Sequence, residues 1–466
     1  MTTDTQIRDN LTACIQFLTK KGFYADALYM NSTQFSLRKD NTSFDADEEA
    51  DRGVRLRIYV EDRFLDRSIS GCDKKDLMRA ARLLIEEAHR YRPLARIPLK
   101  VDTKRLKRSF RSKMKEDPRK IPLKEKIKYC EELHTRFSDE QFVNIRVAYT
   151  EGHTHEIFVN QHRVLSQKIP RVIVAVMPFV RTPEGQTRYH YRSFFAPGFE
   201  ATRISTAEVR SIKKMARAII NAGRIPPGSY TCYLPPDMTG LLAHESFGHG
   251  MEADTVMLGR AKSIEYFGQR IAPEEVSILD DPSYAGAHGH IFFDHEGQLA
   301  SPTYLVKNGI VTQPITCQYA ASFMAKKGFG WQLTANARAE SYDHKIYARM
   351  TNTYFAKGNQ SPKKMLKSIR DGIYLHNASG GMEDPKGWGV QIQGITAERI
   401  KDGKRTGEFF YEAGMTGYLP KLLSNITAVG SDFTVPGTGF CGKGHKEWVP
   451  VSDGGPSLVI EEVPLS

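Results

Sequence analysis

The sequence has no apolar run long enough to cross a membrane. The longest candidate, residues 172–180, contains Pro178 and falls far short of the roughly 18 residues that a membrane helix needs. It also has no internal repeat and no low-complexity tract. With 466 residues, of which 40% are hydrophobic and 26% charged, the chain has the composition of a globular protein rather than a disordered or fibrous one.

Cysteine is scarce and shows no metal-binding or disulfide spacing. The six cysteines are far apart without any C-x-x-C pair, and residues 1–6 have no basic region typical of an export signal. We therefore expect reduced thiols in a cytoplasmic protein. Four of them, which lie in or beside apolar stretches, are expected to be small buried side chains: Cys14, Cys130, Cys232 and Cys317.

Acidic residues are few in one segment, which accounts for most of the net charge of +12. Residues 100–128 hold 13 Lys and Arg against 4 Asp and Glu, a net +9. A solvated loop is the ordinary explanation, and binding of nucleic acid or an acidic partner is the alternative. Because Phe110 is the sole aromatic residue between the clustered charges, the pattern argues against base stacking and against nucleic acid as a partner.

The first half of the chain alternates between helical and extended patterns. Apolar residues at helical spacing predict helices over 7–18, 77–91, 123–133 and 206–222. Strict alternation predicts a strand over 54–59, and shorter runs at 143–149, 157–159, 172–177 and 188–194 predict an antiparallel meander. His153 and His155 then fall in a turn of this meander.

A linker at residues 223–228 divides the chain, because two prolines between glycines cannot continue a helix. Beyond it, short strands are expected at 290–293, 303–306 and 310–313, joined by turns at 294–297 and 307–309. The sequence thus predicts an α+β protein. A mixed helix and strand domain over residues 1–223, with antiparallel strands, precedes a β-rich domain over 224–466.

The chemistry is concentrated in an H-E-x-x-x-H motif formed by His244, Glu245 and His249, with Asp237 as a candidate helix N-cap. In zinc hydrolases with H-E-x-x-H, the histidines are four residues apart on one helix face. Here they are five apart, about 140° around a regular helix, so a shared ion requires a local π-bulge. Gly248 and Gly250 ease that distortion.

Cys441 is the best candidate for a third ligand, because surrounding glycines leave its thiol accessible. A buried, inert cysteine is an equally good interpretation from sequence. Residues 437–442 also read G-x-G-x-x-G, but the 24 residues that follow leave no space for a βαβ unit, so we reject a dinucleotide site.

Residues 244–254, 349–353 and 441–443, with 294–297 and the glycine-rich 380–394 between them, resemble the TldD/PmbA family of metallopeptidases through most of 229–466. The resemblance implies a β-rich C-terminal metallopeptidase domain that binds Zn²⁺ through His244, His249 and Cys441. It also implies that Glu245 is the general base, acting on water activated by the metal to hydrolyse unstructured peptides or proteins. It further implies a homodimer, or a heterodimer with a relative lacking the motif. Ala253, His295 and residues 443–445 depart from the family pattern and affect the expected substrate preference.

Other residues give weaker signals. His288, His290 and His295 could form a second metal cluster, although His288 and His290 flank a hairpin and histidines in such a place need not bind an ion. Arg349 and Asn352 could bind substrate carbonyls or pin their loop to the domain. The alternative to a peptidase is a non-catalytic partner subunit, or a protein that binds nucleic acid or an acidic partner and holds a structural metal.

Overall fold

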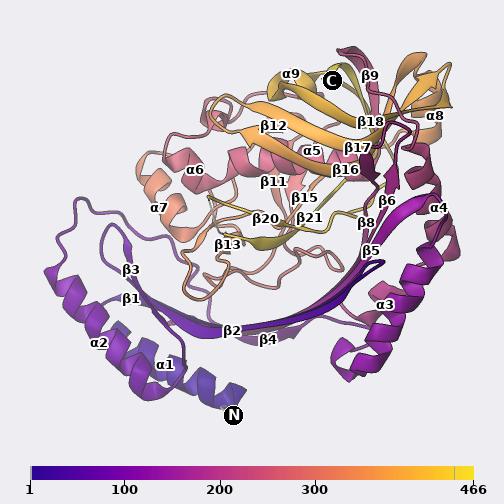
Figure 1. Cartoon of the computed structure of the whole chain (residues 1–466). Helices are drawn as coiled ribbons and strands as arrows, with labels where there is room; N and C mark the ends of the chain where they lie inside the picture. The colour runs from indigo at the N-terminus through magenta and orange to yellow at the C-terminus, as the bar shows by residue number, and fades with distance from the viewer. Residues whose placement is uncertain (1–2, 445–446) are drawn as a thin grey trace.

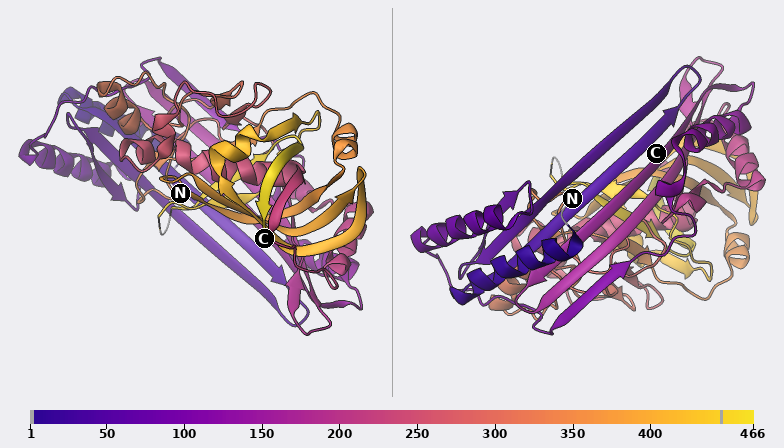
Figure 2. Two further views of the ribbon diagram at one scale, coloured as in Figure 1. Left: turned by 90° about the horizontal axis from the view of Figure 1, so that it is seen from above. Right: turned by 90° about the horizontal axis from the view of Figure 1, so that it is seen from below.

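The computed structural model of the chain describes residues 3–444 and 447–466. It confirms the predicted α+β fold. A long curved sheet carries two pairs of helices on its outer face, and the C-terminal part lies in the hollow of the sheet (Figure 1). Seen from below, the long strands cross the molecule between the helix pairs (Figure 2). None of the helices in the described ranges has the length and apolar character needed to cross a bilayer.

The N-terminal sheet is a platform of unusually long strands. Its order is β3-β2-β1-β5-β6-β4, and β7 and β8 also pair with β6. The strands pair in antiparallel fashion, except that β4 runs parallel to β6. The strands are β1 Tyr24–Lys39, β2 Phe44–Tyr59, β3 Phe64–Ile69, β4 Leu106–Arg111, β5 Phe142–Asn160, β6 Arg163–Arg181, β7 Thr187–Tyr189 and β8 Arg192–Ala196.

Four amphipathic helices cover the outer face of this sheet and confirm the predicted helical patterns. They are α1 Asp4–Lys20, α2 Lys74–Arg90, α3 Leu123–Phe137 and α4 Thr206–Ala218. The apolar stripes of α1 and α2 share a core with β1, β2 and β5, and those of α3 and α4 share a second core with β5 and β6. A capping box between Ser205 and Glu208 begins α4.

The prediction of separate short strands at 143–149 and 157–159 is wrong. The polar stretch between them continues as strand, because β1 pairs with it on one side and β6 on the other. Backbone hydrogen bonds therefore hold a segment that its side chains do not mark as a strand. His153 and His155 accordingly lie within β5 and not in a turn. Part of the basic segment, expected to be a loop, forms β4 at the sheet edge.

The C-terminal part consists of two six-stranded sheets with the orders β12-β11-β10-β15-β21-β20 and β18-β17-β16-β9-β22-β19. Helix α5, Pro236–Ala243, contributes to the core cluster that both sheets share. The strands are β9 Gly228–Leu234, β10 Ile278–Asp280, β11 Thr303–Lys307, β12 Ile310–Val311, β15 Asn352–Phe355, β16 Asp371–Asp384, β17 Gly389–Lys401, β18 Lys404–Tyr418, β19 Ile426–Val429, β20 Gly439–Cys441, β21 Val449–Gly454 and β22 Leu458–Leu465. Smaller elements are the β13 Ala337–Arg338 and β14 Tyr347–Ala348 pair and helices α6 Ala253–Met257, α7 Gln318–Lys326, α8 Pro362–Ser368 and α9 Leu419–Ser424.

Both turns predicted in the C-terminal part form, but the expected strand before the first of them does not. Asn308 and Gly309 both have positive φ, 49° and 77°, and join β11 to β12, as predicted for this hairpin. Residues 290–293 do not form the expected strand. Phe293 makes a single bridge to Leu299 across the turn, because the segment instead offers its backbone to Gln167 of β6.

Buried polar contacts hold the two halves together. Arg57 of β2 forms ion pairs with Asp26 of β1, at 2.7 Å, and with Glu296 of the C-terminal part, at 3.0 Å. Gly297 has φ 75°, and a Cβ there would lie 2.2 Å from the Phe158 ring. The sheet and the turn therefore pack too closely for a side chain at this position, which fixes the C-terminal part on the N-terminal platform.

Candidate metal centre

The helix that carries the motif begins at Pro236, so Asp237 lies in its first turn and is not the N-cap as predicted. Every residue from Met238 to Ala243 is buried between the sheets. The α-helix then widens into a π-helical turn over His244–Gly248, followed by a 3-10 turn over His249–Met251. This confirms the π-bulge that the five-residue spacing of the histidines requires.

The glycines of this turn act through packing rather than through backbone freedom. Gly248 has φ −62°, a conformation open to any residue. A Cβ on Gly248, however, would lie 1.7 Å from Met350 Sδ, and one on Gly250 would lie 2.5 Å from Glu383 Oε1. Glycine is therefore needed here because neighbouring side chains approach the backbone closely, and not because it eases the backbone distortion as predicted.

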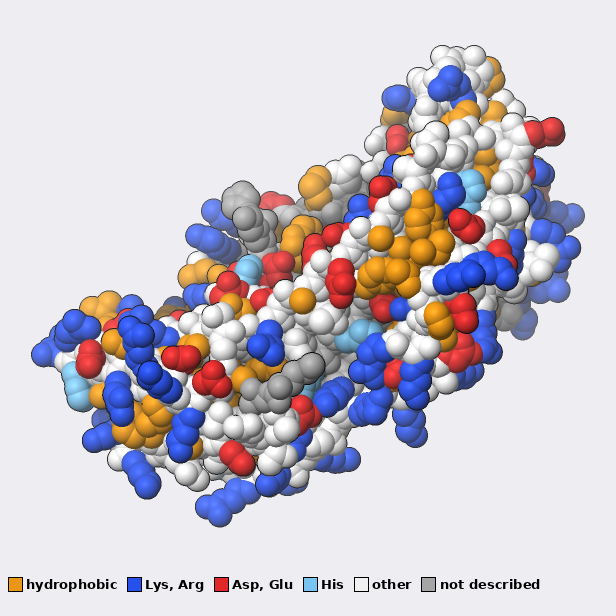
Figure 3. Space-filling view, turned by 60° about the horizontal axis from the view of Figure 1, so that its bottom comes forward, with side chains coloured by type: hydrophobic (Ala, Val, Ile, Leu, Met, Phe, Trp, Pro, Cys, Tyr) orange, Lys and Arg blue, Asp and Glu red, His pale blue; other side chains and the backbone are white. Residues whose placement is uncertain are grey.

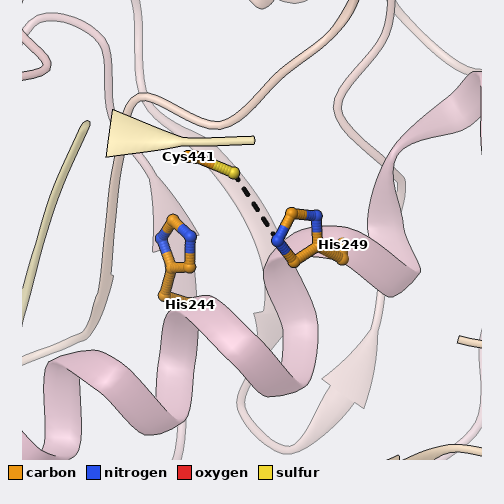
Figure 4. A group of neighbouring side chains, drawn as sticks. All are labelled: His244, His249 and Cys441. Atoms are coloured by element: carbon orange, nitrogen blue, oxygen red, sulfur yellow. Dashed lines mark hydrogen bonds between the residues drawn. The ribbon is translucent and has the colours of Figure 1, made fainter. Parts of the chain in front are cut away.

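The structure brings His244, His249 and Cys441 together. Each offers one ligand atom, and the three atoms lie within 4.8 Å of one another. The imidazole rings are perpendicular, with an interplanar angle of 89° and centroids 5.6 Å apart, and Cys441 Sγ is 3.5 Å from His249 Nε2 (Figure 4). The histidines come from one helix and the cysteine from β20, about 190 residues later, so only the folded chain forms this group.

Electrostatics distinguishes Cys441 from the other cysteines. All six are free and buried, as predicted for Cys14, Cys130, Cys232 and Cys317. Burial raises the pKa of the Cys14 and Cys130 thiols to about 12. Burial acts in the same direction on Cys441, but the imidazoles of His249 and His244 outweigh it and hold the pKa of this thiol well below its usual value. A thiolate is the form that binds metals.

A second layer of charged side chains supports this group. Glu252, which is 1% exposed, lies 3.8 Å from His249 Nδ1. Lys443 Nζ is 2.8 Å from both Glu252 Oε2 and Asp254 Oδ2. Burial raises the pKa of the Glu252 carboxyl, but Lys443 and His249 outweigh it and hold that pKa well below its usual value, so Glu252 stays ionised.

Arg349 connects this layer to the strand that carries the cysteine. Its Nη2 donates to the Cys441 carbonyl at 2.7 Å, its Nη1 donates to the Glu447 carbonyl, and its Nε is 3.4 Å from Glu252. Asn352 donates to the Asp281 carbonyl at 2.7 Å. Of the two roles that the sequence left open for Arg349 and Asn352, the structure shows contacts that pin their loop.

Residues that sequence reasoning undervalued also lie at the site. Lys443 belongs to a segment that carries the family resemblance and also begins a departure from its pattern, but it was given no role, and Glu383 was not identified. Glu383 Oε2 accepts from the Gly250 backbone N–H at 3.0 Å, and burial raises the pKa of Glu383 well above its usual value. A Cβ on Gly381 would lie 2.6 Å from Glu245 Cγ, so the glycine-rich stretch lets β16 approach the motif glutamate.

The three histidines considered for a second metal cluster contact other residues, away from His244, His249 and Cys441. His288 Nδ1 lies 3.0 Å from the Gly439 carbonyl, and His290 Nδ1 lies 3.1 Å from the Pro282 carbonyl. His295 Nε2 is 3.2 Å from Glu156 Oε1. In the described parts of the chain they do not form a common ligand group, so the structure does not support a second metal cluster there.

Comparison with known proteins identifies the family. The PmbA/TldA metallopeptidase C-terminal domain matches residues 227–466. A metalloprotease of Methanothermobacter thermautotrophicus is 30% identical over 347 residues, 74% of each chain. A zinc metalloprotease TldD homolog of Saccharolobus solfataricus is 29% identical over 261 residues, covering 54% of this chain and 55% of that protein. The crystal structure of TldE from Thermococcus kodakarensis covers 98% of this chain and 100% of its own with a TM-score of 0.72 at 14% identity, which shows a shared fold. The chain therefore belongs to the TldD/PmbA family of metallopeptidases.

Proposed function

We propose that this protein is a zinc-dependent peptidase that hydrolyses unstructured peptides or proteins, with Glu245 as its general base. The observation that carries the proposal is that ligand atoms of two imidazoles and one cysteine lie within 4.8 Å of one another. The imidazoles come from the helix turn that also holds the motif glutamate, and the cysteine comes from β20. Family membership supports the same activity, and one relative is named a zinc metalloprotease.

The donor set fits zinc. Three nitrogen and sulfur ligands are typical of catalytic zinc sites, which keep one position open. Among the described residues, the buried Nδ1 of His244 has no hydrogen-bond partner, so no protein acceptor fixes the tautomer of this ring. When bound, zinc would polarise the scissile carbonyl and make water a stronger nucleophile at neutral pH.

The protein's own residues orient the ligands and move the proton. Glu252, held ionised by Lys443, attracts the Nδ1–H of His249 and thereby favours the tautomer whose Nε2 is free to bind. Glu245 accepts the proton of the attacking water on its carboxylate and returns it to the amine leaving group. Two other residues close in sequence to the proposed ligands could bind a metal by their residue type: the carboxylate of Asp254 is engaged by Lys443, and His445 lies outside the described residues.

Replacing Glu245 by glutamine tests the mechanism. Glu245→Gln keeps the shape of the side chain and leaves the three proposed ligands in place, so zinc content is expected to stay near one equivalent per chain. Hydrolysis of an unstructured peptide is expected to fall by about 10² or more, because the amide cannot accept the proton. Glu265→Gln, at a side chain 61% exposed, is the matched control.

Three outcomes contradict the proposal in different ways. Cleavage at the wild-type rate by Glu245→Gln would show that another group handles the proton. Loss of zinc together with activity would make Glu245 a ligand or a support for the ligands. Zinc retention without peptide cleavage by the wild-type protein would favour the alternative, a partner subunit or binding protein with a structural metal.

Assembly into a homodimer, or into a heterodimer with a relative lacking the motif, stays a prediction. Light scattering on the purified protein, alone and mixed with such a relative, measures it directly.

A further inference from the structure

The basic segment of the sequence borders a cavity that the proposed chemistry does not use. The cavity has a volume of about 690 Å³, within the range of ordinary ligand sites. We call it the basic cavity. Its lining includes Arg108, Phe110, Arg111, Ser112, Lys113 and, from β6, Arg171, and no Asp or Glu occurs among the described residues that line it. Lys and Arg side chains also gather along the margins of the face shown in Figure 3.

Aromatic rings form part of the wall. The ring of Phe110 stacks on Phe292, with centroids 5.1 Å apart and an interplanar angle of 17°. The guanidinium of Arg108 lies 4.8 Å from the centroid of Phe110. The sequence showed only one aromatic residue here, because Phe292 comes from a distant segment. The stacking fixes Phe110 and places the charge of Arg108 beside the opening.

Arg171 gives the cavity a buried positive charge. It is 8% exposed, and it donates to the carbonyls of His288 and His290 and to the hydroxyl of Thr154. These acceptors are neutral, and within the described ranges no carboxylate lies within ion-pair distance of Arg171. Buried Arg57, in contrast, has two carboxylate partners. Glu156 is near enough to act on the charge of Arg171 but does not contact it, and a buried cation without a carboxylate in direct contact favours an anionic ligand.

Ser112 provides an independent sign of a missing partner. It is 9% exposed, and its Oγ has no hydrogen-bond partner in the described part of the chain. Buried hydroxyls normally have a partner, and this one lies between Arg111 and Lys113 in the lining. A hydroxyl flanked by cations is a suitable donor to a carboxylate.

The basic cavity shares part of its lining with a second cavity that reaches the strand of Cys441, and among the described residues this second cavity, unlike the first, also has acidic residues in its wall. Ile169, Arg171 and Ile291 line both cavities, and the second, of about 390 Å³, reaches Phe440. Phe440 directly precedes Cys441 on edge strand β20. An extended polypeptide, at about 3.3 Å per residue, can therefore follow this lining toward β20.

We propose that the basic cavity binds an acidic stretch of the peptide substrate, whose carboxylates face Arg108, Lys113 and Arg171 and whose position sets a preference for acidic sequences. This inference rests on the proposed peptidase function. A polypeptide is favoured over a nucleic acid because the proposed activity acts on polypeptides, and because the ring of Phe110 is already stacked on Phe292 rather than free to stack on a base.

Matched peptides and matched variants test the preference. One unstructured peptide carries several Asp and Glu residues, and the other has Asn and Gln in their place. The triple variant Arg108→Gln, Arg111→Gln, Lys113→Gln removes three charges from the cavity. The control Lys104→Gln, Arg105→Gln, Lys107→Gln removes the same charge from the same segment without touching the lining.

For the wild-type protein, we expect KM for the acidic peptide to be about tenfold lower than for its amide counterpart, as a few charge contacts would give. The cavity variant is expected to lose this difference, through KM rather than kcat, whereas the control keeps it. Equal KM values in the wild-type protein would overturn the inference. An equal loss in the control would also overturn it, because the attraction would then be a property of the whole segment.

Binding to the Glu245→Gln protein, followed by fluorescence anisotropy of the labelled peptides, separates this inference from the proposed function. Selective binding of the acidic peptide without cleavage by the wild-type protein would support the cavity and refute the peptidase. Cleavage without selectivity would refute the cavity alone. A single-stranded oligonucleotide that displaces the acidic peptide and binds more tightly at 0.15 M salt would overturn the inference in favour of nucleic acid.

Discussion

Gly248, which ends the π-helical turn, allows a test whose sign is decided by packing. Its φ of −62° suits alanine, and alanine in a helical turn is favoured over glycine by about 1 kcal/mol. An argument from backbone conformation alone therefore predicts that Gly248→Ala stabilises the protein. The new Cβ, however, would lie 1.7 Å from Sδ and 2.6 Å from Cε of Met350, whose side chain is fully buried.

The steric term is expected to win. Forcing an extra methyl group into a packed core costs about 1 to 3 kcal/mol, so after the gain of about 1 kcal/mol the net loss of unfolding free energy is about 0 to 2 kcal/mol, and the 1.7 Å approach to Sδ places it toward the upper end. Because the turn sets the spacing of His244 and His249, zinc content is expected to fall as well. Urea denaturation followed by fluorescence gives the stability, and metal analysis of the purified variant gives the zinc content.

A double-mutant cycle with Met350→Ala identifies the cause. Met350→Ala alone leaves a cavity and costs about 2 to 5 kcal/mol, but it also removes the obstacle to a Cβ at position 248. Gly248→Ala is therefore expected to be neutral or stabilising in the Met350→Ala background, with a coupling of about 1 to 3 kcal/mol. Gly389→Ala, where a Cβ would meet nothing within 4 Å, is the control. A stabilising effect of Gly248→Ala in the wild-type background would refute the reasoning.

Two further predictions concern the thiol and a buried histidine. Cys441→Ala is expected to reduce bound zinc from about one equivalent to below about 0.1, since one of three proposed ligands is lost, whereas Cys317→Ala keeps it; metal analysis decides, and full retention would remove Cys441 from the site. Burial lowers the pKa of His190 to about 3, so its neutral form is favoured in the fold, and stability is lost as pH falls below the unfolded value of about 6.5. When the pH is lowered from 7 to 5.5, the unfolding free energy of His190→Phe, measured by urea denaturation, is therefore expected to fall by about 1 kcal/mol less than that of the wild-type protein. An equal fall in both proteins would contradict this assignment.

Local patterns predicted the elements whose signals lie within a few residues. The helical stripes of α1 to α4, the Asn308-Gly309 hairpin and the π-helical turn all follow from spacing or turn chemistry in short windows. The polar part of β5 gave no such signal, because its extended form depends on two neighbouring strands. Residues 290–293 gave a false one, because Gln167 occupies the backbone groups that a strand would have used.

The candidate site shows the same division. His244, Glu245 and His249 are close in sequence, so a motif could identify them. Cys441 was left open by the residues themselves, and only the family resemblance assigned it to the metal. Glu252 and Lys443 lie in segments that carry the family resemblance, but neither was assigned a role. Their contact spans 191 residues, so their shared role could not be derived from spacing.

The position of Cys441 depends on side-chain hydrogen bonds to its strand as well as on backbone pairing. Strand β20 has three residues and lies at the edge of its sheet, where, among the described residues, it pairs with β21 alone. A strand this short is weakly held by its own ladder. His288 Nδ1 lies within hydrogen-bond distance of the Gly439 and Val451 carbonyls, on β20 and β21, and Arg349 Nη2 donates to the Cys441 carbonyl.

These contacts explain why residues that resemble metal or substrate ligands are buried nearby without forming a ligand group. His288 is 1% exposed and Arg349 is also 1% exposed, and their donors are directed at backbone carbonyls of the strand that presents the thiol. Since Arg349 also reaches Glu252, which faces His249, one side chain connects the backbone of Cys441 to the support of a histidine. The two halves of the proposed metal centre, although far apart in sequence, are thus held in register by buried donors rather than by sheet pairing alone.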